Sequence, residues 1–92
     1  MEYELECRYD TRQSFYGKAQ VEEKHYDNFI AIILYSYGTE VASIEEYKDF
    51  TKYFYNGKYS QTTTRHQKEF FKQNDLSDKE IKELFKNGIL EV

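Results

Sequence analysis

The chain has 92 residues, enough for a single domain over residues 1–92, and a formal net charge of −4. A core of this size leaves little room for an enclosed active site. The acidic balance disfavours a general nucleic-acid-binding protein, because attraction to phosphates supplies most of the affinity of such proteins.

The single cysteine, Cys7, has no partner for an internal disulfide, which is typical of a reducing cytosol. One Cys and two distant His residues do not predict a zinc site, and we expect no metal and no cofactor. The acidic start differs from a secretion signal, and the longest apolar run, residues 29–34, is too short to span a bilayer. We therefore expect a cytoplasmic protein with no membrane partner.

Three strands are predicted in the first half of the chain. Apolar and polar residues alternate over residues 13–23, which is typical of a half-buried strand. Residues 29–37 are rich in β-branched and aromatic side chains and predict the central strand. A turn at 37–39 leads to a third strand over 40–44. The polar, aperiodic residues 24–28 are expected to link the first two strands.

The second half predicts a hairpin and two helices. Residues 45–52 are ambiguous between a helical turn and a strand, and Asn56-Gly57 predicts a hairpin between strands at 51–55 and 58–61. The first helix is expected to begin at the threonine run, which supplies its N-cap, and to end near residues 73–74.

The second helix has the clearest boundaries. Ser77 and Glu80 match a capping box at its start, and Asn87-Gly88 is expected to end it, with the next two apolar residues packing back. We therefore predict an α+β fold in which a small antiparallel sheet of four to five strands is followed by two C-terminal helices, at least one packing on the sheet.

A polar cluster lies where the predicted hairpin meets the first helix. Hydroxyls, a guanidinium, an imidazole and free helix amides are suited to binding a phosphate or carboxylate. Ordinary N-capping, with His66 half-buried on the same helix face as Phe70, is the alternative. The residues of this cluster are Thr62, Thr63, Thr64, Arg65 and His66.

Arg65, Lys68 and Lys72 recur at helical spacing and form a basic stripe. Such a stripe can meet an acidic partner or a phosphate backbone, but it is more often the solvated side of a helix.

Tyrosines and carboxylates supply a second candidate surface. Tyr35, Tyr37, Tyr53 and Tyr55 are expected to act as aromatic anchors, and the sequence does not distinguish base stacking from protein binding. Acidic residues are expected to provide charge complementarity to a basic partner. They are Glu22, Glu23, Glu40, Glu45, Glu46 and Asp49.

Catalysis is not expected. His25 and His66 accompany no recognised nucleophile motif, and adjacent acids on a strand point to opposite faces. With only four glycines, the chain has no glycine-rich phosphate loop.

Three segments carry a resemblance: Ser14-Phe15-Tyr16-Gly17-Lys18-Ala19, residues 35–42 (YSYGTEVA), and residues 59–73 from Tyr59-Ser60-Gln61 through Glu69-Phe70 to Lys72-Gln73. Over about residues 10–75 the chain resembles a family of small uncharacterised proteins from phages and mobile elements of low-GC Gram-positive bacteria. Residues 45–52 form a longer insert than that family leads one to expect, and residues 76–90 lie outside the shared region. The resemblance implies a genomic context and no activity.

From this context we expect a non-enzymatic protein that binds a host protein, as an anti-defence inhibitor of the anti-CRISPR kind. An acidic, tyrosine-rich protein is suited to competing for the nucleic-acid channel of a nuclease. The alternative is a nucleic-acid-binding accessory module that uses residues 62–66 and the basic stripe. A monomer or a small homo-oligomer is consistent with either function.

Overall fold

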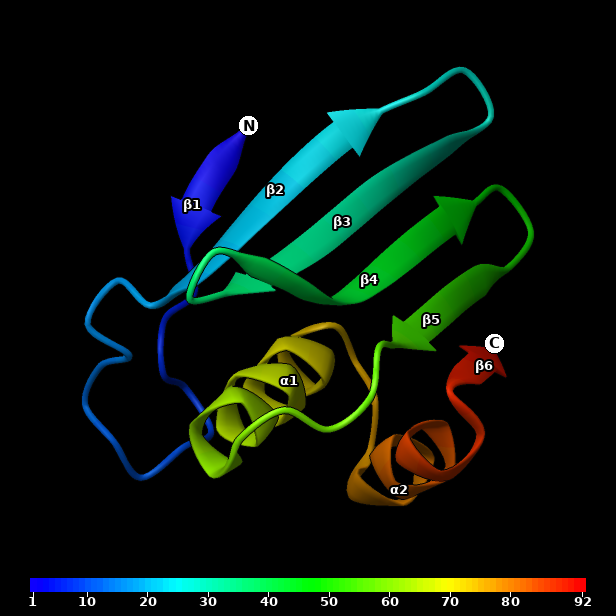
Figure 1. Ribbon diagram of the computed structural model, residues 1–92. Helices are drawn as coiled ribbons and strands as arrows, with labels where there is room; N and C mark the ends of the chain where they lie inside the picture. The colour runs from blue at the N-terminus through cyan, green and yellow to red at the C-terminus, as the bar shows by residue number, and fades with distance from the viewer.

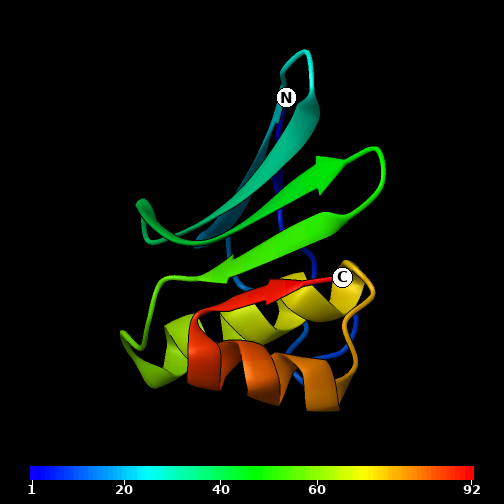
Figure 2. The same ribbon diagram turned by 90° about the vertical axis from the view of Figure 1, so that its right-hand side faces the viewer.

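The computed structural model describes residues 1–92 and contains a six-stranded antiparallel sheet with two helices on one face (Figures 1 and 2). The predicted α+β class is confirmed, although the sheet has six strands rather than four to five. The strands are neighbours in chain order: β1 (Glu2–Glu4), β2 (Ala19–His25), β3 (Phe29–Ser36), β4 (Thr39–Tyr47), β5 (Thr51–Tyr55) and β6 (Ile89–Glu91). The helices, α1 (Gln61–Gln73) and α2 (Asp78–Asn87), lie between β5 and β6 in sequence.

The core lies between the sheet and the two helices. Leu34 and Ile44 from the central strands meet Phe70 and Phe71 of α1 and Leu84 of α2, and all five side chains are fully buried. Burying one side chain of this size stabilises a fold by about 1.5–3 kcal/mol. These apolar contacts therefore hold both helices on a single face of the sheet.

Both helices begin with serine caps. Ser60, rather than the threonine run, is the N-cap of α1, and its hydroxyl accepts a hydrogen bond from the amide of Thr63. Ser77 and Glu80 form the predicted capping box of α2. Gly88 ends that helix at φ 83°, in the left-handed region that glycine adopts without a steric penalty.

The strand predicted over residues 13–23 is only partly correct, because β2 begins at Ala19 and continues to His25. Ser14 accepts the amide of Tyr16 through its hydroxyl, and Tyr16 and Gly17 both have positive φ. The amide of Gly17 donates to the carboxylate of Glu4. One local hydrogen bond and one long-range hydrogen bond thus build a turn where the apolar alternation predicts a strand. The link between β2 and β3 is correspondingly short and covers residues 26–28.

The hairpin predicted at Asn56-Gly57 is wrong. Residues 58–60 form no strand, and the chain passes directly into α1. The edge of β5 is instead paired with β6, which follows α2, with Tyr53 opposite Leu90. The carbonyl of Gly57 accepts a hydrogen bond from the Gln67 side chain. A long-range strand pairing therefore replaces the local one that the Asn-Gly signal favours.

The ambiguous residues 45–52 contain no helical turn. Strand β4 continues to Tyr47, whose amide donates to the carbonyl of Phe50 across a tight turn, and β5 begins at Thr51. A bulge at Val41 shifts the register between β3 and β4, so that Leu34 pairs with Ala42 and Tyr35 with Glu40.

The segment from residue 5 to residue 18 links β1 to β2 and runs beside α1 (Figure 1). Leu5 and Phe15 anchor it in the core. Neither β1 nor this packing is predicted from the sequence.

Candidate functional site

The sheet face opposite the helices, called the open face below, has no helix covering it (Figure 2). Successive strand residues point to opposite faces, and Ile32 and Ile44 are in the core, so Ile33 and Ser43 point outward. Uncovered apolar surface of this kind is typical of interaction sites. On the four inner strands the open face comprises Gln20, Glu22, Lys24, Phe29, Ala31, Ile33, Tyr35, Glu40, Ser43, Glu45, Tyr47, Lys52 and Phe54, and the edge strands add Glu2, Glu4, Ile89 and Glu91.

A row of four stacked aromatic rings crosses one end of the open face. Tyr26 stacks on Phe29 at 4.9 Å between ring centroids, Phe29 on Tyr47 at 5.0 Å, and Tyr47 on Phe50 at 4.6 Å. The ammonium of Lys52 lies 5.7 Å from the Phe50 ring centroid. Two turns and two strands thus bring together rings that are separated by up to 24 positions in the sequence.

Two tyrosine hydroxyls hold carboxylates on the open face. The hydroxyl of Tyr35 donates to Glu22 at 3.0 Å, and that of Tyr47 donates to Glu45 at 2.8 Å. Each hydrogen bond to a carboxylate raises the pKa of the tyrosine hydroxyl. Both hydroxyls therefore remain protonated donors at neutral pH, and they orient the two carboxylates beside the aromatic rings.

The structure does not bring the four predicted aromatic anchors together. Only Tyr35 lies on the open face, and Tyr37 is exposed in the β3–β4 turn. Tyr53 is buried in the core, where its hydroxyl donates to the Asn74 carbonyl and burial raises its pKa. Tyr55 stacks on Phe85 at 4.1 Å on the helix side.

The predicted acidic positions are likewise divided between the two faces. Glu22, Glu40 and Glu45 belong to the open face. Glu23 and Glu46, next to them in sequence, point to the helix side. Asp49 is exposed in the β4–β5 turn.

The threonine–histidine cluster at the start of α1 is mainly a packing unit. Thr63 and His66 are buried, and Ser36 on β3 joins them: its hydroxyl lies 2.9 Å from Thr63 Oγ1 and 2.8 Å from His66 Nδ1. The rings of Phe15 and His66 pack in a T-shaped arrangement with their centroids 4.5 Å apart. Thr62 and Thr64 are half-buried, and the hydroxyl of Thr64 donates to the Ser60 carbonyl. The capping and packing alternative thus accounts for most of this cluster.

The buried imidazole of His66 has a lowered pKa. Burial is the main cause, the Arg12 guanidinium lowers the pKa further, and Asp10 opposes the shift. Its Nε2 atom has no hydrogen-bond partner. The imidazole is therefore neutral at pH 7 and acts through packing.

We expect the free energy of unfolding to fall as the pH drops below about 6.5. The unfolded chain, in which His66 has its ordinary pKa of 6.5, binds a proton more readily than the folded chain does. The stabilisation is complete above that value and is lost progressively toward the lowered pKa of the folded state. Urea unfolding at about pH 7.5 and about pH 5.5 measures this effect, and His66→Asn should reduce the difference between the two values. An equal pH dependence in both proteins would exclude His66 as its source.

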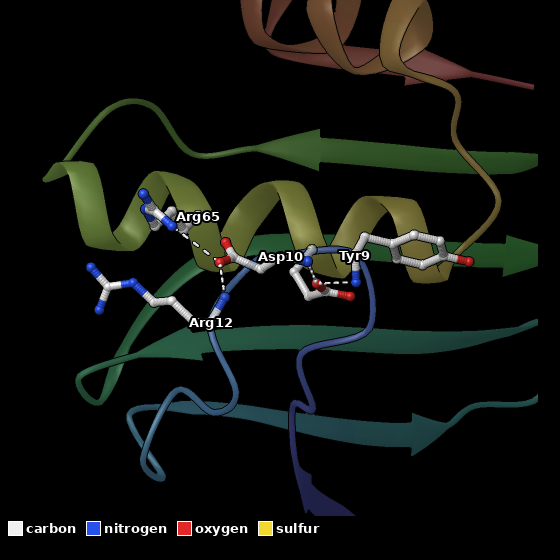
Figure 3. Close-up of polar contacts among 5 residues, drawn as sticks. Tyr9, Asp10, Arg12 and Arg65 are labelled. Carbon is white, nitrogen blue, oxygen red and sulfur yellow. Dashed lines mark hydrogen bonds and ion pairs between the residues drawn. The ribbon is translucent and has the colours of Figure 1, made fainter.

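The basic stripe lies on the exposed side of α1, as predicted. Arg65 forms an ion pair with Asp10 of the N-terminal segment at 3.1 Å (Figure 3), and Lys72 pairs with Asp78 of α2 at 3.2 Å. Lys68 is exposed and forms no ion pair. A concavity of about 350 Å³ runs along these side chains and is also lined by Tyr9.

Sequence reasoning missed the role of Glu69, which is buried on α1. Its Oε1 accepts the amides of Tyr9 and Asp10, each at 2.9 Å (Figure 3), and its Oε2 accepts the side chain of Gln73 at 2.6 Å. The position of this acid immediately before Phe70 on the buried side of the helix is the only sequence signal of its burial.

No group of three or more His, Cys, Asp or Glu side chains is placed to hold a metal ion. Neither helix has the length and apolar character needed to cross a membrane.

Comparison with known proteins identifies a family but no function. A family of unknown function (DUF8033) matches residues 3–87. No curated protein matches the chain, and neither does any solved structure.

Proposed function

We propose that this chain, which belongs to the DUF8033 family, is a protein-binding module that docks a basic partner on its open face. The uncovered sheet face, with its aromatic row next to oriented carboxylates, is the observation that supports this proposal. The chemistry needed is binding rather than turnover.

Aromatic side chains supply a large contact area for two side-chain torsions each, so little conformational entropy is lost on binding. In the aromatic row, stacking already restricts the rings of Phe29 and Tyr47 from both sides. A guanidinium group stacks on an aromatic face, and the exposed ring of Tyr26 at the end of the row keeps one face free of the other rings. The Tyr26 end of the row is therefore suited to an arginine side chain of a partner.

Carboxylates next to the rings favour the same partner chemistry. Glu22 and Glu45 are held by tyrosine hydroxyls, so binding a guanidinium requires little reorganisation of either carboxylate. Lys24 lies 3.7 Å from Glu22 and contributes a weak, exposed pair. Glu40 and the edge-strand acids Glu2, Glu4 and Glu91 add further carboxylates. Acids therefore exceed bases on the open face, and charge complementarity points to a basic protein surface.

An anti-defence role is a narrower form of this proposal. A basic nucleic-acid channel on a host nuclease has the charge that the open face complements, and occupying it would exclude the nucleic acid. The phage context of the resembling proteins supports this form. Under it, an excess of DNA should release the captured partner.

Affinity capture from a bacterial lysate with two charge-reversal variants tests the proposal. Glu45 and Glu46 are adjacent and change the net charge equally, but they point to opposite faces of the sheet. We expect Glu45→Lys to abolish recovery of a basic protein that the wild type retains. Glu46→Lys should retain it, because its side chain lies outside the open face.

Thermal unfolding of both variants serves as the check on folding. If both variants remain folded and recover equally little of the basic protein, net charge, and not the open face, drives capture. Retention by Glu45→Lys, or recovery of no basic protein by the wild type, would contradict the proposal.

A further inference from the structure

We propose that the groove that crosses the exposed side of α1, from the N-terminal segment to α2, on the side of the molecule opposite the open face, binds the backbone of a single-stranded nucleic acid. Two concavities, of about 350 and about 660 Å³, share Lys68 and Lys72. The first extends to Arg65 and Tyr9, and the second to Lys79 and Lys82 of α2. Because the two concavities share these side chains, they adjoin on α1, and together they are called the groove below; five basic side chains line it.

The groove is basic on an otherwise acidic protein. The only acid on α1 is Glu69, which is buried and has both carboxylate oxygens occupied by hydrogen-bond donors. Asp10 and Asp78 neutralise Arg65 and Lys72 in part. The side chain of Asp78 is exposed, so a phosphate can replace it at Lys72, whereas the side chain of Asp10 is mostly buried. The remaining bases, Lys68, Lys79 and Lys82, are exposed and form no ion pairs.

The spacing of the bases fits a run of phosphates. Arg65 and Lys72 are seven residues apart on one helix, which corresponds to about 10 Å at 1.5 Å per residue. Lys68 lies between them, so three cations follow one another along this length, as the backbone of a nucleic acid requires. Lysine acts as a point charge and accepts phosphates in many orientations, whereas planar recognition of a carboxylate favours arginine.

An exposed aromatic ring favours a single strand over a duplex. The side chain of Tyr9 is 59% exposed and lines the concavity beside Arg65, Lys68 and Lys72. A basic groove next to an aromatic ring is the usual arrangement in sites for single strands, where unpaired bases stack on the ring. The groove does not use Thr63 or His66, both of which are buried.

This inference is independent of the proposed protein-binding function, because the groove and the open face share no residue. The acidic open face repels phosphates, and the chain's net charge of −4 predicts that binding is weak and strongly salt-dependent. We expect dissociation constants of about 10⁻⁴–10⁻⁶ M near physiological salt, as for sequence-independent binding.

Fluorescence anisotropy with a labelled oligothymidylate of about 12 nucleotides tests the inference. Five phosphate contacts, one for each basic side chain of the groove, predict a slope of log K against log salt of about −3.5, which is about a 130-fold loss of affinity between 50 and 200 mM salt. Lys79→Ala/Lys82→Ala leaves three of these contacts and should reduce the loss to about 18-fold. The matched control, Lys18→Ala/Lys48→Ala, removes two exposed lysines that lie outside the groove and should keep the wild-type slope.

Tyr9→Ala distinguishes the contribution of base stacking to the affinity from that of the basic side chains. Removing the Tyr9 ring should weaken binding of the oligonucleotide about tenfold without changing the salt slope. No binding at 50 mM salt, or equal slopes for the two double variants, would overturn the inference. Polyglutamate of equal charge that binds as tightly as the oligonucleotide would also overturn it, because the groove would then be a site for acidic protein segments.

Discussion

Phe71→Ala is expected to lower the free energy of unfolding by about 4 kcal/mol. Phe71 is fully buried at the junction of both helices and the sheet, with ring centroids 5.4 Å from Phe70 and 6.3 Å from Tyr53 and Phe85. Truncation removes buried apolar area and leaves a cavity that a sheet and two helices cannot easily close. Urea unfolding monitored by circular dichroism measures the loss.

The matched control is Phe54→Ala, the same change on the open face. Phe54 lies on β5 next to Tyr53 but points away from the helices and is only half-buried. We expect it to cost less than half as much as Phe71→Ala, since little apolar area leaves water when it packs. Equal losses would mean that the open face is needed for folding and is not spare surface for a partner.

Glu69→Ala is expected to cost about 3 kcal/mol, although it removes a charge from an acidic protein. The carboxylate accepts two backbone amides of the N-terminal segment and the side chain of Gln73. Without it, the amides of Tyr9 and Asp10 lose their acceptor, and hydrogen bonds to charged groups are worth about 1.5–3 kcal/mol each.

Hydrogen exchange locates this effect. The amides of Tyr9 and Asp10 should exchange faster in Glu69→Ala, while those of β3 follow only the global loss of stability. Glu83→Ala, an exposed acid on α2, is the control and should stay within about 0.5 kcal/mol of the wild type. A Glu69→Ala protein as stable as this control would show that the hydrogen bonds from the Tyr9 and Asp10 amides to Glu69 do not stabilise the fold.

Local signals in the sequence predict the helices well. The capping box at Ser77 and Glu80 and the glycine at position 88 place α2, because each depends only on residues within a few positions. The apolar run from Phe29 likewise places the central strand, β3. The α+β class follows from this order of elements.

Long-range pairing is what the sequence does not reveal. Nothing near Asn56-Gly57 indicates that the partner of β5 lies beyond two helices, at Ile89–Glu91. The turn at Ser14–Gly17 depends on Glu4, 13 residues away from Gly17, which accepts its amide. The alternation of apolar and polar residues does not reveal a contact between residues that are far apart in the sequence.

The candidate surfaces depend on the same missing information. The basic stripe on α1 is predicted, but its extension to Lys79 and Lys82 requires the packing of α2 beside α1. The sequence indicates that adjacent acids on a strand point to opposite faces, but only the strand register shows that Glu45, and not Glu46, lies on the open face. Partner binding at the open face is thus a proposal that rests on the structure.

An NMR titration of the labelled protein with an arginine-rich peptide tests the central claim, that the open face receives a basic partner. We expect the largest shift changes at residues 29–35 and 43–47, where the aromatic row and the oriented carboxylates lie. Changes of similar size at exposed acids outside the open face, such as Glu6 and Glu83, would contradict the claim, because the peptide would then be following net charge alone.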